Sequence, residues 1–137
     1  MRVVLDTNVL ISALIRKGKP ERLFTKLVRK EAELILSPEI LKEFLKVIRQ
    51  ARFAEYVDEN GIESFIALLQ RTSRMVKATS RFNITPDSGD NLVISTAFDG
   101  KVDYVVSGDH HLLRVKKFRK IKIVTVDEML RVLEKRA

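Results

Sequence analysis

Short apolar runs alternate with helical patterns along most of the chain. Four runs of mostly aliphatic residues, without strict polar alternation, predict strands that are buried on both faces: Arg2–Leu5, Glu33–Leu36, Tyr104–Val106 and Ile121–Val124. A weaker run at Met75–Lys77 predicts a fifth strand. The pattern therefore favours a central sheet of four to five strands.

Apolar residues between these runs recur at the spacing of an α-helix. The segment 62–69 places them at i, i+3, i+4 and i+7, and the segments 23–28 and 40–48 carry similar stripes. We expect the long helical stretch from about Leu41 to Ser73 to project from the sheet as a helical arm.

Local signals indicate where some of the helices begin. Ser37 followed by Pro38 predicts one helix start, and Thr125 with Glu128 forms a capping box that opens a last helix. Strands that alternate with helices favour right-handed crossovers and a mostly parallel sheet. We expect a three-layer α/β/α fold, in one domain over residues 1–137, because no linker, repeat or composition break divides the chain.

The composition narrows the class of protein. Of the 137 residues, 45% are apolar and 32% are charged, which is a globular balance. The chain has no cysteine, so thiol nucleophiles, thiolate zinc sites and iron–sulfur clusters are excluded. The only histidines, His110 and His111, are adjacent and point in different directions, which disfavours a histidine metal site. No apolar run reaches the length of a membrane helix, and we expect a cytoplasmic protein without membrane contact.

The charge balance points to a polyanionic partner. The chain has 26 Lys and Arg residues against 18 Asp and Glu residues, which gives a formal net charge of +8. A basic surface of this kind favours nucleic acid as a partner, whereas the alternative is that the basic residues only aid solubility.

Four acidic residues from separate segments are expected at one rim of the sheet. Asp6 directly follows the first strand, and Asp109 follows the strand at 104–106 after a Ser-Gly turn. Glu43 lies in the helix after the second strand, and Asp90 lies at the start of the helix that leads to the strand at 104–106. Because ligands of parallel α/β sheets bind at the carboxyl ends of strands, these carboxylates are predicted to converge.

Each acid taken alone also has an ordinary structural explanation. Asp6, Asp90 and Asp109 suit helix caps or first turns, and Glu43 suits a solvated helix face. Convergence favours a metal site, because close carboxylates repel one another unless a cation neutralises them. Oxygen ligands without His or Cys select Mg²⁺ or Mn²⁺. An acidic centre within a basic surface is the charge arrangement expected of a nuclease.

The same residues lie in motifs that resemble those of the PIN-domain family. The run Val3–Ser12 resembles the opening motif, and Ser107–Leu113 resembles the last one. Glu43 within Ile40–Phe44 resembles the second acid of the family, and Asp90–Leu92 resembles the third. The resemblance covers nearly the whole chain, with the motifs in order.

This resemblance implies a magnesium- or manganese-dependent ribonuclease that leaves 5′-phosphate and 3′-hydroxyl ends. It assigns metal binding and catalysis to four acids: Asp6, Glu43, Asp90 and Asp109. Gly89 stands where many relatives carry another acid, which leaves Asp90 rather than Asp87 as the expected ligand. The resemblance also implies a homodimer and kinship with VapC-type toxins of prokaryotic toxin–antitoxin pairs, and hence an antitoxin partner.

Two further sets of side chains complete the predicted site. Polar residues beside the acids are expected to orient the ligands or a metal-bound water: Thr7, Asn8, Asn91 and Ser107. The alternative for the two asparagines is that they satisfy local backbone groups. RNA is expected to contact Lys and Arg residues near the rim: Arg16, Lys17, Lys19, Arg49, Arg114, Lys116 and Lys117.

Other functions are less consistent with the sequence. A phospho-acceptor receiver domain needs a Lys after its last strand, where this chain has Thr125-Val126-Asp127. A haloacid-type phosphatase needs Asp-x-Asp after the first strand, where this chain has Asp6-Thr7-Asn8. The alternative that stays open is a PIN domain that binds RNA or protein without catalysis.

Overall fold

The computed structural model describes residues 1–136, and within them six strands form a single sheet. The strands are β1 (Arg2–Leu5), β2 (Glu33–Leu36), β3 (Ser73–Met75), β4 (Tyr104–Val106), β5 (Lys117–Phe118) and β6 (Ile121–Val124). Their order is β3-β2-β1-β4-β6-β5, and every pair is parallel except β5 with β6. The prediction of an α/β fold with a mostly parallel sheet is confirmed.

The sheet differs from the sequence prediction at its two edges. The third strand spans Ser73–Met75, two residues earlier than predicted, and pairs with β2 over Leu34–Leu36. Strand β5 was not predicted, because two residues are too few to give a hydrophobic pattern. It folds back on β6 through a turn in which Arg119 has a φ of 55°.

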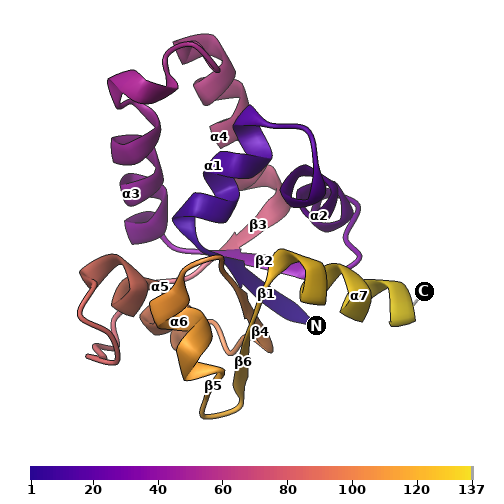
Figure 1. Cartoon of the computed structure of the whole chain (residues 1–137), viewed down its shortest axis with the longest axis vertical. Helices are drawn as coiled ribbons and strands as arrows, with labels where there is room; N and C mark the ends of the chain where they lie inside the picture. Colours follow the sequence, from indigo (N-terminus) through magenta and orange to yellow (C-terminus); the bar gives the residue numbers. More distant parts are fainter. Residues whose placement is uncertain (137) are drawn as a thin grey trace.

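Helices cover both faces of the sheet (Figure 1). They are α1 (Thr7–Ile15), α2 (Lys19–Val28), α3 (Pro38–Ile48), a 3₁₀ turn (Ala51–Phe53), α4 (Glu59–Thr72), α5 (Ser88–Asp99), α6 (His110–Val115) and α7 (Val126–Arg136). Helices α1 to α4 lie on one side with α7 against α2, whereas α5 and α6 lie on the other side. The predicted three layers are therefore present. Within residues 1–136, no helix is long and apolar enough to cross a membrane.

The predicted helix starts are formed by side-chain caps. The Ser37 hydroxyl accepts a hydrogen bond from the N–H of Ile40 at 3.2 Å, which opens α3. At α7, the N–H of Glu128 donates to the Thr125 hydroxyl at 3.1 Å, and the N–H of Thr125 donates to the Glu128 carboxylate at 3.0 Å. These bonds satisfy backbone donors that the first turn of a helix leaves without partners.

Helices α3 and α4 rise from the sheet as the predicted arm, but their inner faces belong to the core (Figure 1). Phe65 of α4 packs against Phe44 of α3 and Phe24 of α2, with ring centroids 5.6 and 5.0 Å apart. All three rings are buried. These aromatic contacts hold the arm, and with it Glu43, in a fixed position beside the sheet.

The strand order creates a crevice beside the central strand. From β1 the chain builds β2 and β3 on one side of the sheet and then crosses to β4, β6 and β5 on the other. This reversal leaves a gap at the carboxyl ends of β1 and β4, where α/β proteins bind their ligands. Residues Asp6 and Ser107 directly follow these two strand ends.

Candidate active site

Asp6 is held at the end of β1 by hydrogen bonds of its backbone N–H and its carboxylate with three groups. Its backbone N–H donates to the carbonyl of Val106 at 3.0 Å, which continues the pairing of β1 with β4. One carboxylate oxygen accepts from the N–H of Val9 at 2.9 Å and caps α1, and the other accepts from the Ser107 hydroxyl. The side chain is buried, and this burial raises its pKa, with a further contribution from the charge of Asp109. Hydrogen bonds from Ser107 and Val9 act in the opposite direction.

Ser107 connects Asp6 to Asp109. Its hydroxyl donates to Asp6 and accepts from the N–H of Asp109 at 3.0 Å. Asp109 in turn caps α6, where its carboxylate accepts from the N–H groups of His111 at 2.8 Å and Leu112 at 3.3 Å. The structure therefore fixes two of the predicted acids through a buried serine that was expected to orient them.

The third acid, Asp90, lies in the first turn of α5. Asp87 caps this helix by accepting from the N–H groups of Gly89 at 2.7 Å and Asp90 at 3.2 Å. Oδ2 of Asp90 is buried and has no hydrogen-bond partner among the described residues. Burial, followed by the charges of Asp109, Asp87 and Asp6, raises the pKa of Asp90 to about 6.

All four predicted acids line one cavity, which has a volume of about 120 Å³. We call it the acidic cavity. Glu43 reaches it from α3, where its side chain is half-buried, while the other three acids reach it from β1, α5 and the turn after β4. Its lining is Asp6, Thr7, Asn8, Glu43, Val47, Asp87, Gly89, Asp90, Val93 and Asp109. Segments more than 100 residues apart in sequence thus contribute carboxylates to one small space.

The donor set of the acidic cavity suits a hydrated divalent cation. Across residues 1–136, no three acidic or histidine side chains are grouped closely enough to hold one ion directly. Mg²⁺ commonly binds through one or two carboxylates and several waters, and the cavity has room for water molecules. A cation there would give the buried Oδ2 of Asp90 a partner and offset the repulsion that raises its pKa.

The polar residues predicted beside the acids fall into two groups. Thr7 and Asn8 line the acidic cavity, and Ser107 binds two of its acids. Asn91 instead holds the loop before α5: its side-chain oxygen accepts from the N–H groups of Ile84 and Thr85, each at 3.0 Å. This contact corresponds to the alternative of satisfying local backbone groups.

The predicted basic residues are exposed and come from three separate segments of the chain. Arg16 and Lys17 follow α1, and Lys116 and Lys117 follow α6. Three others have specific surroundings: Lys19 pairs with Asp127 at 2.7 Å, Arg49 pairs with Glu59, and Arg114 lines a small pocket with His111. Lys19 also lines a pocket that adjoins the acidic cavity.

Sequence reasoning missed a basic groove beside the acids. This groove, of about 570 Å³, shares Glu43, Asp87 and Gly89 with the acidic cavity. We call it the basic groove after its three cationic side chains, Lys42, Lys46 and Arg81. It also contains Glu39 beside the two acids that it shares with the acidic cavity. The two lysines lie one helical turn apart and flank Glu43, which was a usable signal. Nothing in the sequence pattern pointed to Arg81, because only the fold brings its loop alongside α3.

Comparisons with known proteins agree with this architecture. A family model described as a PIN domain matches residues 2–111. An uncharacterized protein from Methanocaldococcus jannaschii is 30% identical over 145 residues, which cover 98% of this chain and 93% of the relative. A similar fold occurs in the crystal structure of VapBC2 from Rickettsia felis bound to a DNA fragment from their promoter. That match has a TM-score of 0.62 and 12% identity, and it covers 91% of this chain and 98% of that chain.

Proposed function

Because this chain belongs to the PIN-domain family, a family of nucleases, we propose that it is an endoribonuclease that depends on Mg²⁺ or Mn²⁺. The observation that carries the proposal is the meeting of Asp6, Glu43, Asp90 and Asp109 in one cavity, with a buried oxygen of Asp90 left without a partner. Four unneutralised carboxylates in so small a space are unfavourable for folding alone, which supports a role in binding a cation.

The four acids would hold the cation, and the surrounding bonds would keep them in place. When bound, a divalent cation lowers the pKa of a water and offsets the charge of a phosphodiester. Ser107 and the N–H of Val9 orient the two oxygens of Asp6, and the α6 cap orients Asp109. Thr7 and Asn8 offer polar groups at the cavity wall for a water or a phosphate oxygen.

The basic groove supports RNA as the substrate. Lys42 and Lys46 line it from α3, and Arg81 lines it from the facing loop. The Nη1 atom of Arg81 donates to the carbonyls of Ala78 at 2.6 Å and Ser80 at 3.0 Å, which holds the guanidinium at the groove. RNA phosphates bound by these cations would place the neighbouring part of the RNA at the acids of the acidic cavity. The affinity for RNA would then fall steeply as the salt concentration rises.

Cleavage of a labelled RNA by the pure protein tests this function. We expect cuts that require Mg²⁺ or Mn²⁺, leave 5′-phosphate ends and are lost in Asp90→Asn. Asp99→Asn is the matched control, since it removes the same charge from the other end of the same helix, where the side chain lines neither the acidic cavity nor the basic groove. Metal-independent cleavage would contradict the proposal. RNA binding without any cleavage over a range of Mn²⁺ would favour the non-catalytic binding module.

We also propose that the protein is the toxin of a toxin–antitoxin pair, acts in the cytoplasm and forms a homodimer. The fold shared with a chain of the VapBC2 complex supports the first of these. An antitoxin would inhibit by covering the acidic cavity, for instance with an arginine that pairs with its carboxylates. Expression of the protein should then arrest cell growth, and Asp90→Asn should remove the arrest. Light scattering of the pure protein tests the dimer.

A further inference from the structure

A second pocket adjoins the acidic cavity and shares no lining residue with the basic groove. It has a volume of about 430 Å³ and shares Asn8 with the acidic cavity. Ser107, whose hydroxyl bonds to Asp6 and to the N–H of Asp109, also lines it. It lies between α1, the start of α2, the end of β4 and the start of α7. We call it the side pocket. Nothing in the proposed metal chemistry uses it.

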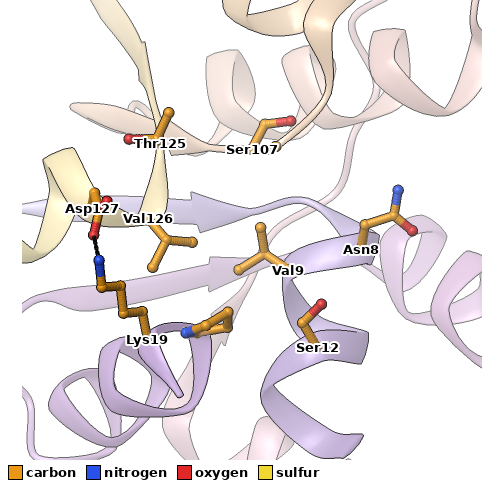
Figure 2. Close-up of a pocket in the computed structure, with 10 residues that line it drawn as sticks. Asn8, Val9, Ser12, Lys19, Ser107, Thr125, Val126 and Asp127 are labelled. Carbon is orange, nitrogen blue, oxygen red and sulfur yellow. Dashed lines mark ion pairs between the residues drawn. The ribbon is translucent and has the colours of Figure 1, made fainter. Parts of the chain in front are cut away.

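The two sides of the acidic cavity offer different surfaces. The basic groove presents charged side chains, whereas the side pocket presents apolar ones, with Val9 and Val126 directed into the same space (Figure 2). Hydroxyls of Ser12 and Thr125 add polar groups at its edge. The ion pair of Lys19 with Asp127 lies at the end of the pocket opposite Asn8 and Ser107 (Figure 2).

We propose that the side pocket binds the nucleoside attached to the scissile phosphate of RNA, with the base against its apolar walls. This inference rests on the proposed function, because the phosphate of that nucleotide would occupy the acidic cavity. The two spaces adjoin at Asn8, which lines both, and at Ser107, which lines the side pocket and bonds to two acids of the acidic cavity, so one nucleotide would extend from one into the other. The volume lies within the range of about 300–1,000 Å³ that is usual for small-molecule sites.

The chemistry of the pocket favours a nucleoside over other occupants. A base has an apolar face for the valines, a ribose has hydroxyls for the serine and threonine at the edge, and the attached phosphate suits a metal-loaded neighbour. The side pocket would therefore set which nucleotide lies at the cut, while the basic groove would bind the backbone without regard to sequence.

Titration of the isotope-labelled protein with the four nucleoside 5′-monophosphates in Mg²⁺ tests the proposal. We expect saturable amide shifts at Ser12, Gly108 and Val126, with one base preferred. Ser12→Phe should fill the pocket and weaken this binding about tenfold. Thr25→Phe, at an exposed position of α2, is the control and should bind like the wild type. Ser12→Leu is a milder variant that should weaken binding in the same direction.

The outcomes separate this inference from the proposed function. Metal-dependent cleavage with unchanged nucleotide affinity and cut sites in Ser12→Phe would overturn the side-pocket proposal alone. Shifts confined to Lys42, Lys46 and the groove would also overturn it. Nucleotide binding in the side pocket by a protein that never cleaves RNA would overturn the nuclease function and leave the pocket assignment standing.

Discussion

The two ends of helix α5 lie in opposite chemical environments. At its start, Asp90 is buried, has an oxygen without a partner among the described residues and faces three other acids. At its end, Asp99 accepts hydrogen bonds from the Ser80 N–H at 2.9 Å and the Ser80 hydroxyl at 2.5 Å. Burial disfavours the charge of Asp99, but these bonds outweigh it and lower its pKa. Electrostatic repulsion is thus concentrated at the end of the sheet that holds the site.

The stabilised end also contains an aromatic cluster. Phe82 packs against Phe98 of α5 and Phe118 of β5, with ring centroids 5.1 and 4.9 Å apart. The guanidinium of Arg119 lies 4.8 Å from the centroid of Phe98 and contacts the other two rings. We infer that this end stabilises the fold, whereas the acidic end gives up stability for function.

The largest expected effect is on catalysis. Asp90→Asn should lower RNA cleavage at saturating Mg²⁺ by about a hundredfold or more, because it removes a proposed ligand at the reacting centre. Phe98→Ala, at the other end of the same helix, should leave cleavage at low temperature nearly unchanged. Rates measured side by side on one RNA check both. A Phe98→Ala variant that folds but fails to cleave would break the contrast between the two ends.

The aromatic end should dominate stability. Phe98→Ala removes a half-buried ring from the cluster and should lower the free energy of unfolding by about 2–3 kcal/mol. Urea denaturation followed by circular dichroism measures the change. A loss below about 0.5 kcal/mol would show that the cluster contributes little to the fold.

Without metal, a substitution at the acidic end should raise the free energy of unfolding instead of lowering it. The pKa of Asp90 is about 6 when folded and about 3.9 when unfolded, so the folded protein holds this proton more tightly. The contribution of this proton to the free energy of unfolding is complete below about pH 4, and it is lost as the pH rises through about 6. In a chelator, Asp90→Asn should therefore exceed the wild type by about 1–2 kcal/mol near neutral pH and match it near pH 4. Equal stabilities across this range would contradict the repulsion.

The smallest effect belongs to the cation above the rings. Arg119→Ala should cost about 0.5–1 kcal/mol, the usual value of an exposed cation–π contact. Arg119→Lys should recover part of the loss because the ammonium keeps the charge but not the planar stacking. Thermal unfolding of the two variants in parallel measures the difference. An alanine variant as stable as the wild type would show that Arg119 does not stabilise the aromatic cluster.

The sequence was most informative about the candidate site residues that come shortly after a strand. Asp6 and Asp109 could be assigned to one rim because each comes within three residues of a buried strand, and parallel strands bring such positions together. Glu43 needed the family resemblance as well, because a lone glutamate on a helix carries little information. The parallel register of β1 with β4, in which Leu5 pairs with Val106, then places the residues that follow these two strands next to each other.

Contacts between loops and helices could not be foreseen in the same way. The amide of Asn91 is taken up by the backbone of the loop at 84–85, and Arg81 reaches the groove only through the path of the preceding loop. The aromatic cluster joins positions 82, 98 and 118, which share no periodicity. Such arrangements depend on tertiary packing, which hydrophobic patterns do not specify.

Thermal unfolding with and without about 10 mM MgCl₂ or MnCl₂ tests most directly whether the four acids form a cation site. A ligand that binds only the folded state raises the melting temperature, so the wild type and the control Asp99→Asn, whose substituted side chain lies outside the acidic cavity, should both melt higher with the metal. Asp90→Asn should melt at the same temperature with and without it. A wild type indifferent to both cations, or an Asp90→Asn variant that gains as much as the wild type, would contradict the account.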